Sequence, residues 1–203
     1  MKHQPAHNQL GINAHFLVQT LISGDDARPS LEVIYKRRFE RYAFRVSGSY
    51  GRVGQYLQGY YANLDSISTQ RVRTVKEGNI SLRSGIEFRQ NFGSAQVYYG
   101  SDIYLGNHFG YLRRDSLDRN GIESATLEEV RANIISCGVQ PFFGIEVPLS
   151  DNLSIAFEGG VKILYNTSRV TILNNHGVER RNSHFYDMDF DPFIERIVFS
   201  YHF

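Results

Sequence analysis

The last seven residues of the chain alternate in a way that predicts an extended strand. Side chains on a strand point to opposite faces in turn, so Phe199, Tyr201 and Phe203 share one face. Ser200 and His202 fall on the other face. A chain terminus usually frays, and a water-soluble domain gains little from three large rings there. The ending therefore favours a final strand that a sheet holds in place.

The same period of two recurs in about eight segments of the chain. In the third segment, for example, Tyr42, Phe44 and Val46 alternate with Arg45 and Ser47. The eight predicted strands lie near 9–22, 30–39, 42–55, 79–90, 95–111, 129–148, 152–168 and 190–203. The pattern predicts an all-β fold in a single domain over residues 1–203, with 1–8 as a flexible N-terminal segment.

The connections between the predicted strands alternate between short and long. The tight links after the second, fourth and sixth strands are Glu40-Arg41, 91–94 and 150–152. The polar stretches after the third, fifth and seventh strands are about 56–78, 112–128 and 169–189. In an antiparallel ring, this alternation puts every short turn at one end and every long loop at the other. We therefore expect both chain termini at the short-turn end.

Composition narrows the fold and function classes further. Hydrophobic residues make up 41% of the chain, yet no run approaches the roughly 18 apolar residues of a spanning helix. The formal net charge of +1 gives no reason to expect a nucleic-acid partner. The single Cys137 excludes an internal disulfide and a cysteine zinc cluster, and we interpret it as a small hydrophobe on the apolar face.

The polar face of the predicted strands mixes bulky ions with Gly, Ser, Asn and Gln, which suits the narrow interior of an eight-stranded barrel. The charges predicted to line that interior are Arg45, Glu87, Arg83, Asp102, Glu146, Glu158, Lys162 and Arg196. The other face is nearly free of charge and has Tyr and Phe near the strand ends, as an aromatic girdle would. The sequence predicts a closed antiparallel eight-stranded transmembrane β-barrel. A soluble lipocalin-like barrel is the alternative, with the two faces exchanged.

Charges at similar heights on neighbouring predicted strands should pair across the interior, because adjacent strands are only about 4.8 Å apart. An unpaired charge in a poorly hydrated interior is costly. The expected pairs are Arg45 with Glu87, Arg83 with Asp102, and Glu158 with Arg196. We expect this network to close the barrel and to serve structure without catalysis.

The chain resembles small bacterial outer-membrane β-barrels of the OmpA/OmpX type over nearly its whole length. The resemblance rests on the strand pattern, the loop asymmetry and the terminal Phe203, and segments 98–102 and 140–146 are similar to Bacteroidetes-like outer membrane proteins. It implies a location in the Gram-negative outer membrane with both termini periplasmic. It also implies that Phe199, Tyr201 and Phe203 form the signal read by the barrel-assembly machinery. No apolar stretch follows Met1, so we expect the signal peptide to be absent from this numbering.

Two loop segments resemble catalytic sites of lipid A-modifying barrels. Asp115-Ser116 is similar to the Asp-Ser pair of the palmitoyltransferase barrels, with His108 as a candidate base. The same segment is an ordinary charged loop tip, and this interpretation is favoured.

The lipid A deacylase barrels have a catalytic set of His, Ser and Glu. Two pairs in this chain resemble it, Ser183 with His184 and His176 with Glu179. In that family the His and Ser are two apart on a lipid-facing strand, whereas Ser183 and His184 are adjacent.

A last candidate, for a metal site, is the set Asp187, Asp189 and Asp191, which alternate before the final strand. They supply three oxygen ligands, whereas calcium takes about six to eight, so this metal site is weak and a solvated loop is favoured.

These observations favour a non-enzymatic outer-membrane barrel that acts through its extracellular loops or as an accessory subunit of an envelope complex. The long loop predicted after the third strand contains Tyr56, Tyr60 and Tyr61, which we expect to be exposed and which are typical of interface anchors. The alternatives are a lipid A-modifying enzyme (acyltransferase or deacylase) and a small porin-like channel. We expect no cofactor. The expected partners are outer-membrane lipid, lipopolysaccharide, the barrel-assembly machinery and other outer-membrane proteins, with no nucleic acid.

Overall fold

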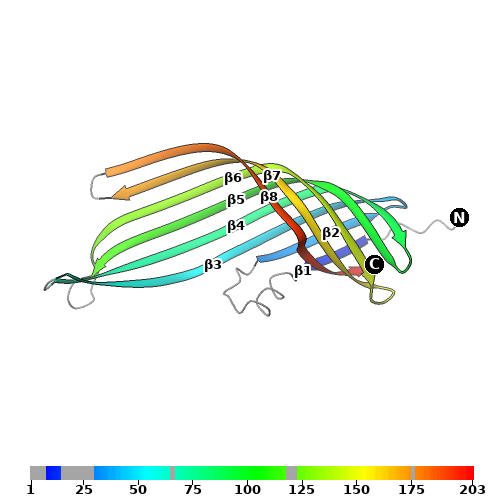
Figure 1. Cartoon of the computed structure of the whole chain (residues 1–203), viewed down its shortest axis with the longest axis horizontal. Helices are drawn as coiled ribbons and strands as arrows, with labels where there is room; N and C mark the ends of the chain where they lie inside the picture. The colour runs from blue at the N-terminus through cyan, green and yellow to red at the C-terminus, as the bar shows by residue number, and fades with distance from the viewer. Residues whose placement is uncertain (1–7, 15–29, 65–66, 118–122, 175–176) are drawn as a thin grey trace.

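The computed structural model describes residues 8–14, 30–64, 67–117, 123–174 and 177–203 (Figure 1). Within these ranges, the side chains at 30, 52–75, 114–117, 123–127 and 189–194 are not described. The strands are β1 (Asn8–Asn13), β2 (Ser30–Arg38), β3 (Tyr42–Leu64), β4 (Ile67–Phe92), β5 (Ala95–Leu117), β6 (Glu123–Pro148), β7 (Leu153–Asn174) and β8 (Gly177–His202). The described part of the chain has no helix with the length and apolar character needed to cross a membrane.

The eight strands form one ring in which each strand pairs antiparallel with the next. The ring closes where β8 pairs with β1, with Tyr201 opposite Leu10 and Phe199 opposite Ile12. The two main-chain bonds between Asn8 and Phe203, both 3.0 Å, tie the described ends together. The predicted all-β antiparallel architecture is confirmed, and Asn8 and Phe203 lie at the end of the ring where the short turns after β2, β4 and β6 lie.

Alternation along the strands separates an apolar outer face from a charged inner face. Phe44 is 43% exposed on the outside, whereas the next residue, Arg45, is 1% exposed inside the ring. Likewise Phe143 is 57% exposed, and its neighbour Phe142 is 4% exposed. A soluble barrel would have the apolar side chains inside, so the structure has the opposite polarity to the lipocalin-like alternative.

The predicted long loops are mostly strand, which corrects the sequence analysis. β3 and β4 are separated only by residues 65–66, and β7 and β8 only by 175–176, so the tyrosines at 56, 60 and 61 lie on β3. The polar composition of these stretches predicts loops. Antiparallel neighbours satisfy each other's backbone hydrogen bonds whatever their side chains, so polar residues on both faces do not end a strand.

The ring has full circumference only near the short turns. β1 has six residues and β2 has nine, whereas β3 to β8 have between 22 and 26. The predicted first strand near 9–22 is described only as far as Ala14. Beyond β1 and β2, the described strands β3 to β8 continue as a long curved sheet, which forms the left half of Figure 1. We call this part the extension.

Candidate functional site

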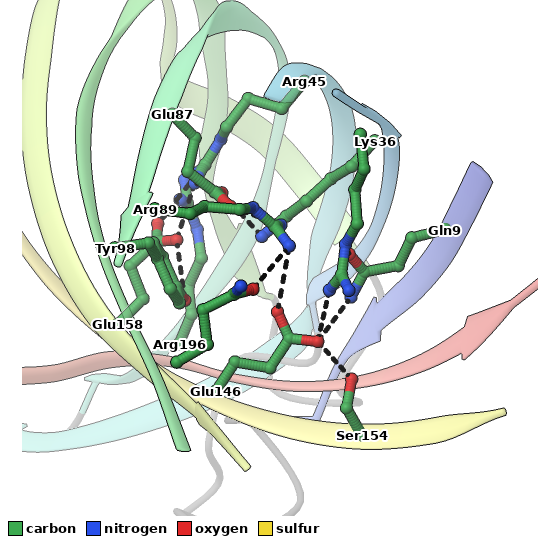
Figure 2. A network of polar contacts seen from close by, with 12 residues as sticks. Gln9, Lys36, Arg45, Glu87, Arg89, Tyr98, Glu146, Ser154, Glu158 and Arg196 are labelled. Carbon is green, nitrogen blue, oxygen red and sulfur yellow. Dashed lines mark hydrogen bonds and ion pairs between the residues drawn. The ribbon is translucent and has the colours of Figure 1, made fainter. Parts of the chain in front are cut away.

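Opposite charges fill the interior of the ring near the short turns (Figure 2). They come from seven of the strands, because every second residue on each strand points inward. The buried charged residues are Glu32, Lys36, Arg45, Arg83, Glu87, Asp102, Glu146, Glu158 and Arg196. Seven of the eight predicted interior charges are thus buried, and the eighth, Lys162, is half-buried and reaches Glu195 at 2.8 Å.

Arg45 is the centre of the first group of contacts. Its guanidinium donates two hydrogen bonds to Glu158, of 2.7 and 2.9 Å, and lies 2.9 Å from Asp102. The same guanidinium lies over the ring of Phe142, 3.8 Å from its centroid. A planar guanidinium can satisfy several carboxylates and stack on a ring at once, which a lysine cannot do. Arg45 therefore links β3 to three other strands.

Glu158 connects Arg45 to the next arginine. Arg196 donates to the same carboxylate and also, through Nε, to Glu32 at 3.1 Å. The hydroxyl of Tyr98 donates to Glu158 at 3.4 Å. A charge-assisted network of this kind holds the long side chains in one arrangement across the ring.

A second group of contacts surrounds Glu87, closer to the short turns. Lys36 donates to Glu87 at 2.7 Å, and Arg89 forms an ion pair with this carboxylate. Lys36 lies over the ring of Tyr98, 4.6 Å from the centroid. Arg89 lies 3.8 Å from Glu146, which connects Glu87 to the rim of the ring.

Glu146 holds the short-turn rim together. Arg38 bonds its carboxylate, the hydroxyl of Ser154 donates to it at 2.6 Å, and Gln9 donates at 3.3 Å. His202 lies 3.4 Å away. The network thus reaches from the rim to the middle of the ring, and β1, β2, β6, β7 and β8 all contribute to its rim end.

The structure brings together two of the three predicted pairs. Arg45 lies 3.6 Å from Glu87, and Arg196 bonds Glu158. Arg83 instead lies 3.4 Å from Glu32, which corrects the predicted pair of Arg83 with Asp102.

The reason for the different pairing is a glycine. Arg45, Gly85 and Asp102 lie in one row across β3, β4 and β5. A Cβ at Gly85 would lie 2.3 Å from the carboxylate of Asp102 and 2.2 Å from the carbonyl oxygen of Ser101. The missing side chain therefore leaves the space in which Asp102 reaches Arg45 across β4.

Several members of the network were not in the predicted set. Arg38, Gln9 and Ser154 have the inward parity of their strands and could have been found from it. Glu195 faces inward beside Arg196, although neighbours on a regular strand point to opposite faces. On β7, Glu158 pairs with Arg196 but Gly160 pairs with Asp191, so the pairing with β8 is out of regular register next to Glu195. Such an irregularity is not predicted by alternation along the sequence.

Apolar side chains fill the space that the charges leave. Ile34, Tyr98, Phe142, Ala156 and Val198 form one buried inward-facing cluster. The ring of Tyr98 lies over Gly144, where a Cβ would come within 2.4 Å of it. Charges and rings together occupy the middle of the ring, so the geometry supports a plug and leaves little room for a substrate.

The palmitoyltransferase-like candidate does not assemble. His108 and Ser116 both lie on β5, eight residues apart, which is about 26 Å along a strand. A base must lie within hydrogen-bond reach of its nucleophile. The side chains of Asp115 and Ser116 lie outside the described residues, and the segment belongs to β5 rather than to a loop tip.

The deacylase-like candidate is also not brought together. Ser183 and His184 are neighbours on β8, not in a loop, so their side chains point to opposite faces. His184 contacts the hydroxyl of Tyr165 at 3.2 Å, and Glu179 forms an ion pair with Arg181. His176 lies outside the described residues.

The metal candidate finds no support among the described side chains. Asp187 is exposed on β8, and the side chains of Asp189 and Asp191 lie outside the described residues. No three His, Cys, Asp or Glu residues in the described part of the chain are grouped closely enough to hold a metal ion.

The three C-terminal aromatic residues face outward. Phe199, Tyr201 and Phe203 are between 48% and 59% exposed, and the rings of Tyr201 and Phe203 stack with centroids 6.3 Å apart. Cys137 is likewise exposed on the outer face. Both placements match the apolar face assigned to these residues from the sequence.

Comparison with known proteins gives a similarity in structure and none in sequence. No family model matches the chain, and no curated protein matches its sequence. Among solved structures, the chain is similar to a major outer membrane protein from Thermus thermophilus, with 11% identity and a TM-score of 0.48. The match covers 98% of each chain.

Proposed function

We propose that this protein is a non-enzymatic β-barrel of the bacterial outer membrane, closed by its own charge network, that acts through its extension as a subunit of an envelope complex. The observation that carries the proposal is the polarity of the ring. Its outer face exposes large apolar side chains on every strand, while its inner face buries paired charges. Contiguous exposed apolar surface of this extent is a liability in water and the normal condition in lipid.

The height of the apolar outer face supports insertion of the ring into a lipid bilayer. On β6 it extends from Ile135 to Ile145, with Val139 and Phe143 between them, all at least 45% exposed. These eleven residues extend about 33 Å along the strand, or about 25 Å once tilted, which matches the apolar band of membrane barrels. At the short-turn end of this band, the pairing of β8 with β1 closes the ring and leaves no strand edge among the described residues, as a lipid environment requires.

Catalysis and conduction are both disfavoured by the interior. The candidate nucleophiles and bases lie far apart or on opposite faces, as described above. Arg45, Arg196 and Tyr98 are fully buried in the path that a solute would take. The function then depends on the extension, the part of the protein that would lie outside the membrane. On β6 this surface comprises residues 123–134, about 40 Å of strand.

Site-directed labelling in intact cells tests the orientation. We expect a membrane-impermeant maleimide to label Val178→Cys, at the far end of β8, when the chain is exported by a Gram-negative host. Asp151→Cys, in the turn between β6 and β7, should react only after the outer membrane is permeabilised. Both variants carry Cys137→Ala so that the native thiol does not react. Recovery in the soluble fraction, or labelling of Asp151→Cys alone in intact cells, would contradict the proposal.

Native electrophoresis of the source membranes in mild detergent tests the role in a complex. We expect the protein to migrate in a species larger than the barrel alone. Replacing residues 171–180 by a two-residue Asn-Gly turn should keep insertion, judged by labelling in the β6–β7 turn, and should return the protein to the mobility of the lone barrel. Equal mobility of the full-length and shortened proteins, apart from the deleted mass, would argue against a partner on this hairpin.

A further inference from the structure

The outer face of β6, β7 and β8 changes character where the extension begins. Up to this level it is apolar, with Ile135 on β6 and Ile163 on β7 both exposed. Two residues farther along β6 the outward residue is Asn133, and the next is Arg131, which is 71% exposed. Since a strand keeps its alternation, this change marks the level at which the lipid-facing band ends.

Aromatic side chains with polar atoms occupy the boundary. Tyr165 packs against Tyr186 with ring centroids 5.2 Å apart and stacks on His184 at 6.1 Å. The ring nitrogen of His184 lies 3.2 Å from the hydroxyl of Tyr165 and 3.3 Å from that of Thr167. Rings with a polar tip are typical of the interface between acyl chains and headgroups.

Three arginines lie directly beyond this aromatic boundary. Arg131, Thr171 and Arg180 form one row across β6, β7 and β8, and Arg169 lies two residues from Thr171 on the boundary side. Arg131 and Arg180 are therefore about 10 Å apart at the backbone, and Arg169 is about 7 Å from Thr171 along the strand. All three long side chains project from the same outer face toward one region of space.

These arginines carry a net positive charge, because among the described residues only Arg131 has a carboxylate partner. Arg131 bonds Glu129 at 2.6 Å. Among the described residues, Arg169 and Arg180 form no ion pair, and both are exposed. The separation of the three cations is comparable to the Debye length of about 8–10 Å, so they repel one another unless an anion lies between them.

We propose that Arg131, Arg169 and Arg180 form a binding site for the phosphate group of a membrane lipid whose acyl chains lie on the apolar band below. The inference rests on the proposed membrane location. The order along β7 matches the order of groups in such a lipid: apolar Ile163, aromatic Tyr165, then Arg169. Guanidinium groups bind phosphate oxygens with charge-assisted hydrogen bonds, and the hydroxyl of Thr171 adds a neutral donor between them.

The test uses the full-length protein in phosphatidylcholine nanodiscs that contain a small fraction of phosphatidic acid, followed by native mass spectrometry of the lipids that stay bound. We expect the wild-type protein to retain phosphatidic acid selectively. The triple variant Arg131→Gln, Arg169→Gln, Arg180→Gln should bind it about a hundredfold more weakly, at roughly a factor of five for each basic residue near an anionic surface.

Arg181→Gln is the matched control. Arg181 is next to Arg180 on β8, so its side chain points to the opposite face, where it pairs with Glu179 at 2.6 Å. This variant should retain phosphatidic acid as the wild-type protein does. Diacylglycerol, which has the same acyl chains without the phosphate, should not be retained by any of the proteins.

Three results would overturn the inference: undiminished retention by the triple variant, equal retention of diacylglycerol, or complete displacement of the lipid by millimolar inorganic phosphate. The last result would identify a site for free phosphate. Incorporation into the nanodiscs is scored separately. If neither protein incorporates, the proposed membrane location fails as well. If both incorporate and neither selects phosphatidic acid, only the lipid site fails.

Discussion

Replacing Arg45 by Ala should lower the free energy of unfolding by about 3–5 kcal/mol, the usual cost of leaving buried charges without their partner. Asp102 would lose the cation 2.9 Å from its carboxylate, and Glu158 would lose two hydrogen bonds. Denaturant unfolding of the protein folded in phosphatidylcholine vesicles, followed by circular dichroism, measures the change. Adding Asp102→Asn to the Arg45→Ala variant should restore part of the lost stability, because it removes the stranded charge.

Arg181→Ala is the control for that experiment. Arg181 also forms an ion pair, with Glu179, but its side chain is 67% exposed, so water screens the interaction. We expect its unfolding curve to match that of the wild-type protein. If Arg45→Ala unfolds at the same denaturant concentration as Arg181→Ala, the interior is hydrated and the network does not stabilise the ring.

Removing two of the largest buried side chains should open a path for ions. Arg45 and Arg196 are each 1% exposed in the middle of the ring, and both contact Glu158. The double variant Arg45→Ser, Arg196→Ser should produce current steps in planar bilayers, whereas the wild-type protein should produce none. The steps should favour cations, because the carboxylates that the arginines neutralised remain inside.

For each protein in the bilayer experiment, membrane insertion has to be shown. The maleimide label on Asp151→Cys, in the turn between β6 and β7, is used for this purpose. Arg196→Ser alone is the milder variant if the double variant does not fold. If the wild-type protein conducts as well as an inserted variant does, the arginines do not close the ring. An inserted variant with no conductance would show that Tyr98 and Phe142 suffice to close it.

The short-turn half of the fold was predictable from the sequence, and the extension was not. The link at Glu40-Arg41 is the turn between β2 and β3, with the amide of Phe39 bonded to the carbonyl of Tyr42 at 2.8 Å. In this half of the fold, apolar and polar residues alternate along each strand in step with the exposed outer face and the buried inner face of the ring. In the extension both faces of β8 are exposed from Gly177 to Met188, so no period of two distinguishes this strand from a loop.

The same limit applies to the candidate site. Arg45, Glu87, Glu158 and Arg196 share the inward face by parity, and parity can be counted from the sequence. Which charge meets which depends on side chains that reach across strands, as Asp102 does over Gly85. The prediction pairs charges only between adjacent strands, so it does not include a contact that crosses an intervening strand.

In a membrane barrel of this polarity, the apolar face of the ring meets lipid and the charged face does not. The chain contains no Trp, so a single introduced Trp reports its own surroundings. Phe142 and Phe143 are neighbours on β6 that point to opposite faces at one height, with exposed fractions of 4% and 57%. In vesicles of brominated phosphatidylcholine, we predict strong quenching of Phe143→Trp and little quenching of Phe142→Trp. Equal quenching, or stronger quenching of Phe142→Trp, would contradict the assignment of the two faces and with it the membrane location.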